Sequence, residues 1–246
     1  MSDSEVNTQS LFSIAKSSGA GVVGVADLSI LKDLEVHSIS LEKFKYGISI
    51  GIPLPNMAID MIELNNPGIL YAHAYHLANN LIDTTLLRIA GWISGEGYLA
   101  LAIPASLRID LKRNIGHISH KAIACAAGVG WIGRNGLLIN PIYGPRLRLG
   151  TVLTDMPLKS GKPMKNQCGI CRLCVDSCPT NALKYSDFEY YPTKREDIFN
   201  PEKCSSRLDE MKNLLSKYSS IYAATVCGIC IKVCPIGKKL SNKFIK

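Results

Sequence analysis

The first 155 residues contain two kinds of hydrophobic pattern, and each predicts a different element. Short apolar runs bounded by Gly and Pro predict strands at 21–26, 46–54, 98–104, 137–140 and 147–154. Helices are expected at 9–19, at 31–36 and at 119–128, where small residues would let another group approach the backbone closely. This alternation of strands and helices predicts a layered α/β unit.

A long helix is predicted between the second and third strands. Asn66 and Pro67 are typical of a helix start, with Asn as the N-cap and Pro at the first helical position. The helix then runs to Gly95 or Gly97. One stripe of apolar positions is expected to face the core: Leu70, Ala74, Leu77, Leu81, Leu86, Ile89 and Ile93.

The composition of the chain changes after residue 155. The segment 156–166 is rich in Pro, Gly and Lys, which predicts a boundary between one unit at 1–155 and a second at 156–246. Amphipathic spacing inside the second unit predicts an inserted helix at about 205–219.

Composition and charge restrict the class of protein. Hydrophobic residues make up 47% of the chain, which excludes a disordered protein, and no apolar run is long enough to span a bilayer. The first ten residues lack the basic and apolar regions of a signal peptide, so we expect a cytoplasmic protein with no membrane partner. The net charge is +8.

The excess positive charge is unevenly distributed. No carboxylate lies between Asp110 and Asp155, although that stretch contains six Lys and Arg residues. A stretch with one sign of charge is typical of a surface that faces an anionic partner or ligand. The alternative is a set of scattered surface charges that acids elsewhere balance in space.

The spacing of the cysteines predicts iron–sulfur chemistry. The run Cys168-x2-Cys171-x2-Cys174-x3-Cys178-Pro179 is typical of bacterial two-cluster ferredoxins, in which the fourth cysteine ligates the other cluster. A second run, Cys227-x2-Cys230-x3-Cys234-Pro235, lacks its first cysteine, and Cys204 supplies the missing thiolate from upstream.

These runs assign eight ligands to two [4Fe–4S] clusters. Cluster 1 receives Cys168, Cys171, Cys174 and Cys234, and cluster 2 receives Cys178, Cys204, Cys227 and Cys230. Zinc is the alternative, but zinc sites use paired Cys-x2-Cys units with four ligands each. The ninth cysteine, Cys125, is expected to be an ordinary buried residue.

Four segments of the chain resemble epoxyqueuosine reductases. They are 128–140 (GVGWIGRNGLLIN), 149–155 (LGTVLTD), 168–183 (CGICRLCVDSCPTNAL) and 227–235 (CGICIKVCP). The resemblance implies a nitroreductase-like α/β domain followed by a bacterial-type 2[4Fe–4S] ferredoxin-like domain. It also implies cobalamin at the junction of the two domains, as in the related reductive dehalogenases.

The resemblance also implies site residues. It places a cofactor beside Gly128, Gly130, Trp131, Arg134 and Asn135, in a cavity lined by 117–135 next to one cluster. At the position of the family's acidic proton donor this chain has Asn114, and an amide cannot serve as a general acid. His120, and after it His117, are therefore the candidate catalytic residues.

The leading hypothesis is an epoxyqueuosine-reductase-like oxidoreductase whose two clusters supply electrons to a corrinoid-like cofactor or substrate in the α/β domain. One alternative is an electron-transfer or reductive-activation partner, with no catalytic cofactor of its own, that docks on another protein such as a corrinoid protein. A second alternative is a tRNA-modifying reductase. Each hypothesis requires an electron donor of the ferredoxin or flavodoxin kind.

Overall fold

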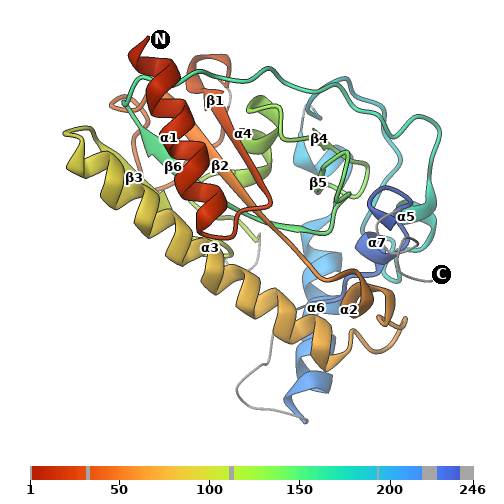
Figure 1. The fold of residues 1–246 in the computed structure, drawn as a ribbon. Coiled ribbons are helices and arrows are strands. Elements are labelled where there is room, and N and C mark those ends of the chain that lie inside the picture. Colours follow the sequence, from red (N-terminus) through yellow and green to blue (C-terminus); the bar gives the residue numbers. More distant parts are fainter. Residues whose placement is uncertain (1, 32–33, 111–113, 193, 218–225, 239–246) are drawn as a thin grey trace, which may run out of the picture.

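The computed structural model describes residues 2–31, 34–110, 114–192, 194–217 and 226–238. A four-stranded antiparallel sheet in the order β1-β2-β6-β3 forms the centre of the N-terminal part (Figure 1). β2 (Tyr46–Pro53) and β6 (Leu147–Thr154) pair along their whole length. β1 (Val22–Asp27) pairs with β2, and β3 (Ala100–Ile103) pairs with the second half of β6.

Helices cover both faces of this sheet. α1 (Asp3–Ser17) and α3 (Ile69–Gly95) lie on one face, and α4 (His120–Ala126) lies on the other (Figure 1). A Cβ added to Gly150 of β6 would lie 2.4 Å from Ile82 of α3, so the helix packs directly on the strand. Because successive strand residues point to opposite faces, Arg148 shares the α3 face of the sheet with Gly150.

α3 differs from its prediction in its start and in its buried face. Its N-cap is Gly68, while the Asn66 side chain accepts a hydrogen bond from the Gly68 N–H at 2.9 Å. The stripe is right in the second half of the helix, where Leu86, Ile89 and Ile93 are buried. It is wrong in the first half, where three predicted core residues are exposed: Leu70, Leu77 and Leu81.

The cause of this rotation lies in what the first half of α3 packs against. Tyr71 and Ala72 are buried there, one or two positions after the predicted Leu70. A Cβ on Gly228 would lie 2.8 Å from the Tyr71 ring, so this end of α3 packs on the second cysteine motif. The periodicity of α3 alone carries no information about that neighbour.

Other predicted boundaries also need correction. α1 begins at Asp3 and not at residue 9, because Ser2 and Glu5 form a capping box at its start. The helix predicted at 31–36 is wrong for the described residues: a 3-10 helix, η1 (Leu28–Ile30), is capped by Asp27, and residues 31 and 34–36 are not helical. Residues 32–33 lie outside the described ranges. The pattern also does not predict α2 (Asn56–Asp60) or β4 (Trp131–Ile132), which pairs with β5 (Leu138–Ile139).

In the described part of the segment after β6, all elements but one helix are short. α5 (Leu173–Asp176) packs against α7 (Ile229–Lys232), and η2 (Arg195–Asp197) precedes α6 (Pro201–Ser216). α6 corresponds to the helix predicted at 205–219 and starts four residues earlier, because Asn200 caps it and Pro201 occupies its first turn. The predicted residues 218–219 lie outside the described ranges.

Both parts of the chain contribute to one buried cluster. This cluster contains Ile59 and Ile62, from the region around α2. It also contains three residues of the later part: Leu215 of α6, Val226, and Ile229 of α7. The boundary expected after residue 155 therefore stays a prediction. None of the described helices is both long enough and apolar enough to cross a membrane.

Candidate metal centre

The eight cysteines predicted as ligands lie on short elements that pack together. α5 contains Cys174, α7 contains Cys230 and α6 contains Cys204 in its first turn. The other five lie in the loops that flank α5 and α7: Cys168, Cys171, Cys178, Cys227 and Cys234. All eight are half-buried and carry no disulfide.

One group of thiols combines three cysteines of the first motif with the last cysteine of the second. Burial, followed by the neighbouring thiols of Cys168, Cys234 and Cys171, raises the pKa of Cys174 to about 12. Burial also raises the pKa of Cys234, and Cys168 and Cys171 add to that rise. These four thiols are therefore close enough to disfavour one another's ionisation.

A second group combines Cys178 with three later cysteines. Burial, and then the thiols of Cys227 and Cys178, raises the pKa of Cys204 to about 11. Burial, followed by the thiols of Cys204, Cys227, Cys174 and Cys178, raises the pKa of Cys230 well above its ordinary value. Cys174 of the first group therefore also lies near this thiol. These two groups have the membership that the crossed assignment predicts, and the assignment itself stays a prediction.

Backbone N–H groups point at one of the sulfurs. Burial acts to raise the pKa of Cys178, but hydrogen bonds from the N–H groups of Thr180, Leu183 and Ala182 outweigh burial and lower it. The Ala182 N–H lies 3.3 Å from the Cys178 sulfur. Such donors stabilise a thiolate and offset the negative charge of a bound cluster.

The donor set fits iron–sulfur clusters. Four thiols in each group is the number that a [4Fe–4S] cluster takes. In the described ranges, no group of three or more His, Cys, Asp or Glu side chains is arranged to hold a single metal ion.

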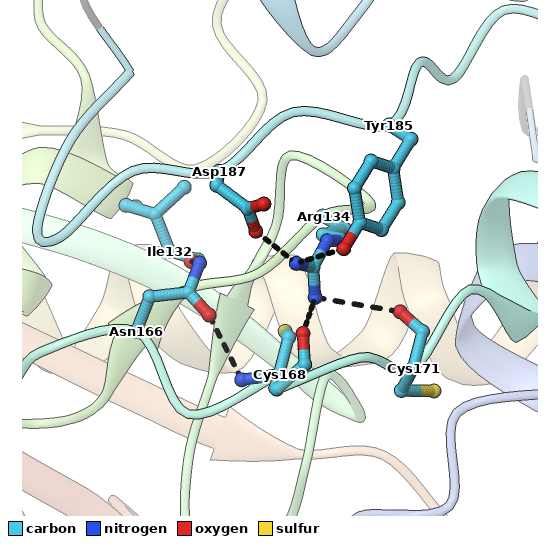
Figure 2. A network of polar contacts seen from close by, with 8 residues as sticks. Ile132, Arg134, Asn166, Cys168, Cys171, Tyr185 and Asp187 are labelled. Atoms are coloured by element: carbon cyan, nitrogen blue, oxygen red, sulfur yellow. Dashed lines mark hydrogen bonds and ion pairs between the residues drawn. The ribbon is translucent and has the colours of Figure 1, made fainter.

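Arg134 joins the segment around β4 to the first ligand loop. Its side chain is buried, with 3% of its surface exposed. One terminal nitrogen donates to the carbonyl oxygens of Gly169 and Cys171, and the other donates to Tyr185 and Asp187 (Figure 2). The guanidinium also stacks 4.3 Å from the centre of the Tyr185 ring. The contacts of Arg134 therefore position the loop that carries Cys168 and Cys171.

Two asparagines complete this connection. Asn166 donates to the Ile132 carbonyl at 3.0 Å and accepts from the Cys168 N–H at 2.8 Å (Figure 2). Asn135, next to Arg134 in sequence, reaches the Cys230 carbonyl of the second motif at 3.5 Å. Neighbouring residues of one segment thus contact the ligand loops of both motifs.

Comparisons with known proteins agree with this geometry. Residues 167–237 match the family described as a 4Fe-4S double cluster binding domain. The epoxyqueuosine reductase of Listeria monocytogenes is 34% identical over 146 residues, which are 58% of this chain and 36% of that protein. The chain is therefore similar in sequence to epoxyqueuosine reductases. The enzyme of Lactococcus garvieae is 29% identical over 219 residues, which are 84% of this chain and 56% of that protein.

Solved structures share the fold. The epoxyqueuosine reductase of Streptococcus thermophilus superposes with a TM-score of 0.61 at 22% identity, over 94% of this chain and 66% of that chain. A reductive dehalogenase described as B12-dependent superposes with a TM-score of 0.70 at 20% identity, over 97% of this chain and 34% of that chain. Another epoxyqueuosine reductase, solved with a tRNA stem loop, has a TM-score of 0.58 at 17% identity, over 94% of this chain and 65% of that chain.

These likenesses confirm the predicted fold class, an α/β domain followed by a double-cluster domain. The chain spans about a third to just over half the length of the curated relatives it matches, with 36% and 56% for the two named above. Activity, substrate and partners therefore remain matters of proposal.

The residues predicted to bind a cofactor are packed in the interior of the protein. A Cβ on Gly130 would lie 2.2 Å from the Ile139 carbonyl oxygen, and one on Gly128 would lie 2.7 Å from the Lys162 carbonyl oxygen. Trp131 is 2% exposed, and its indole N–H has no hydrogen-bond partner among the described residues. The two glycines thus allow backbone segments to approach each other, while Arg134 and Asn135 support the ligand loops.

Two cavities lie elsewhere, and the larger one lies beside the second cysteine motif. The first, of about 490 Å³, is lined by residues that include Cys178, Lys232 and Glu63. The second, of about 340 Å³, is lined by residues that include Tyr71 and, again, Glu63. Neither contains residues of 117–135, so the cavity predicted there does not match these two.

The two candidate catalytic histidines have structural partners. The Nε2–H of His120 donates to the Pro104 carbonyl at 3.2 Å, and its Nδ1 accepts from the Thr151 hydroxyl at 2.8 Å. Burial lowers the pKa of His120 to about 4, so the imidazole is neutral near pH 7 and is a poor general acid there. Nδ1 of His117 lies 2.9 Å from the His37 carbonyl oxygen and donates to it.

Asn114 bridges two parts of the chain. Its side chain accepts from Arg108 at 2.8 Å and donates to the Ser205 hydroxyl of α6. Its backbone has φ +51, which Asn tolerates better than most residues. Asn114, where the resemblance implies an acid, thus connects the segment before α4 to the helix that carries Cys204.

Sequence reasoning missed three residues that support the first ligand loop. Asn166 could have been found from the sequence. An Asn side chain in a turn commonly accepts a hydrogen bond from the backbone N–H two residues later, which here is that of Cys168. Tyr185 and Asp187 lie in an irregular segment with no period or motif. Their contact with Arg134 depends on the tertiary fold.

Proposed function

We propose that this chain is an iron–sulfur oxidoreductase that holds two [4Fe–4S] clusters and delivers electrons to an acceptor associated with its α/β part. The observation that carries the proposal is the crossing of the two cysteine motifs, since each group of four thiols contains members of both. The names of the homologous reductases support the assignment to oxidoreductases.

The protein's own residues would maintain the clusters in three ways. Eight thiolates hold them, and the N–H donors around Cys178 stabilise negative charge on sulfur. Arg134, Asn135 and Asn166 fix the ligand loops against the segment around β4. When bound, such clusters supply single electrons at low potential.

The clusters can be tested by anaerobic reconstitution. We expect about eight iron and eight sulfide per chain, and an EPR signal of reduced [4Fe–4S] clusters after dithionite. Replacing Cys125 with Ala provides the control, because this ninth cysteine is fully buried and belongs to neither group. A chain that binds zinc in preference to iron would overturn the proposal.

For the acceptor we propose a corrinoid or a similar large group. A reductive dehalogenase described as B12-dependent shares the fold. Anaerobic titration with cobalamin, followed by its optical spectrum, tests this. Absence of binding well above micromolar concentration would favour the alternative of an electron carrier that docks on a separate corrinoid protein.

A tRNA substrate is the second candidate function. It is favoured by the names of the relatives, by the solved complex with a tRNA stem loop and by the net charge of +8. We would measure retention of tRNA at increasing salt concentration, because contacts with several phosphates cause a steep fall in affinity. Retention that does not depend on salt, or no retention, would exclude this candidate.

A further inference from the structure

A second polar site lies on the α3 face of the sheet, where α3, β6 and the loop after β3 meet. The Arg148 guanidinium of β6 stacks 4.0 Å from the centre of the Tyr75 ring. Its Nε donates to the Asn79 side chain at 2.9 Å, and one terminal nitrogen donates to the Ser106 hydroxyl. Three separate segments thus converge on one arginine.

Arg148 is a half-buried cation with no described carboxylate to balance it. The other seven residues of β6 are buried, so the strand accepts a charge at this one position. Asp83, farther along α3, accepts from the Ala105 N–H at 2.9 Å and has no ion pair with Arg148. Burying part of a cation without a counter-charge costs free energy, and such groups are concentrated at binding sites.

The polar groups around Ser106 contain more hydrogen-bond donors than acceptors. The Ser106 oxygen accepts from Arg148 and from Asn79, which lies 3.3 Å away, so both of its lone pairs are used. Its own hydrogen then goes to the Tyr75 oxygen at 3.0 Å. The Tyr75 hydroxyl hydrogen and the two hydrogens on the other terminal nitrogen of Arg148 therefore have no acceptor among the described residues.

The backbone at Ser106 is also unusual. Ser106 has φ +62, a left-handed conformation that costs free energy for a residue other than Gly. This conformation places the hydroxyl at the junction of Tyr75, Asn79 and Arg148. The side chain is exposed, so the site is open to solvent.

Two aromatic rings connect this site to the second cysteine motif. Tyr71 and Tyr75 meet edge to face, with ring centres 6.4 Å apart. Tyr71 in turn packs on Gly228, between Cys227 and Cys230. The same ring also lines the smaller cavity. Arg148 is therefore linked to the predicted cluster 2 by an unbroken series of contacts.

We propose that Arg148, Tyr75 and Ser106 form a binding site for an oxyanion, a phosphate or carboxylate group carried by the electron acceptor. Unassigned donors next to an unbalanced guanidinium match the acceptor oxygens and the negative charge of such a group. That the anion belongs to the electron acceptor rests on the proposed function. The anion site itself does not.

The test uses inorganic phosphate, sulfate and acetate as probes of the full chain by calorimetry. We expect phosphate to bind wild type, and Arg148→Gln to weaken it at least tenfold, because a charge-assisted hydrogen bond is lost. Tyr75→Phe keeps the ring and should weaken binding several-fold. The control is Arg88→Gln. It removes an exposed arginine from α3, the helix that carries Tyr75, and the variant should bind as wild type.

Preference for phosphate over acetate would assign a phosphoryl group, and the reverse a carboxylate. No binding of any probe at millimolar concentration, or equal binding by Arg148→Gln, would overturn the site. In protein loaded with clusters, bound phosphate should lower one midpoint potential in wild type and not in Arg148→Gln. A chain that binds phosphate but no cluster would refute the proposed function and leave the anion site intact.

Discussion

Arg134 is a residue whose role depends on its surroundings more than on its charge. Its hydrogen bonds to Gly169, Cys171 and Tyr185 hold the loop that carries two predicted ligands of cluster 1. Replacing Arg134 with Glu to test cofactor binding would therefore mainly disrupt the ligand loop.

We predict that Arg134→Gln destabilises the protein by about 3 kcal/mol, because buried hydrogen bonds to a charged donor are lost. Iron content should fall from about eight toward about four per chain, with loss of one EPR signal. The control is Arg172→Gln, since Arg172 also lies over the Tyr185 ring, 5.0 Å from its centre, but is exposed. Full iron content in Arg134→Gln would contradict the positioning role.

His120 makes a second prediction at the scale of one residue. Its pKa falls from 6.5 to about 4 on folding, so the unfolded chain binds more protons between these values. The free energy of unfolding should therefore be fully maintained above pH 6.5 and decrease as the pH falls toward 4. The loss is at most about 3 kcal/mol, because His120 is half-buried and solvent screens part of the effect.

The measurement is denaturant unfolding at several pH values for wild type and His120→Gln. The difference between the two proteins isolates His120, because all other titrating groups and any acid loss of iron are common to both. A difference that does not change between pH 4 and pH 7 would show that the histidine remains accessible to protons in the folded state.

At the scale of elements, α6 connects cluster chemistry to the rest of the fold. It carries Cys204 in its first turn, and Met211 and Leu215 are buried farther along it. We predict that Cys204→Ala keeps the helix, because Ala is a strong helix former, but loses cluster 2. Iron analysis and EPR after anaerobic reconstitution should show one intact cubane, and Cys125→Ala should retain both.

Two intact cubanes in Cys204→Ala would remove Cys204 from the ligand set. If the helix is unchanged, circular dichroism of wild type and variant should agree while the iron content differs.

The elements also show what the sequence can predict. β2 and β6 follow from continuous apolar runs and the second half of α3 from its hydrophobic period, and their burial matches. The cysteine motifs have a specific spacing, so their grouping follows from chemistry. The predictions for the first half of α3 and for the segment around Arg134 are wrong for the same reason: the neighbours that decide their packing lie far away in sequence.

At the scale of the whole molecule, clusters and sheet share a core. Ile229 of α7 and Leu215 of α6 are buried with residues around α2, so removal of metal should affect the α/β part as well. We predict that chelation under anaerobic conditions lowers the melting temperature by about 10 °C, which corresponds to a loss of about 3 kcal/mol for a chain of this size.

Limited proteolysis provides an independent measurement of the same change. The exposed lysines Lys159, Lys162 and Lys165 should be cut faster by trypsin in the metal-free protein. Equal cutting rates and equal melting temperatures with and without metal would show that the clusters do not stabilise the fold.

The crossing of the two motifs has a consequence for the order of synthesis. The first group of thiols needs Cys234, and the second needs Cys204, Cys227 and Cys230. Under the proposed assignment, the ribosome has translated the chain as far as Cys230 before either set of four ligands is complete. The iron-delivery machinery of the cell would therefore meet a polypeptide whose four sheet strands have already been synthesised.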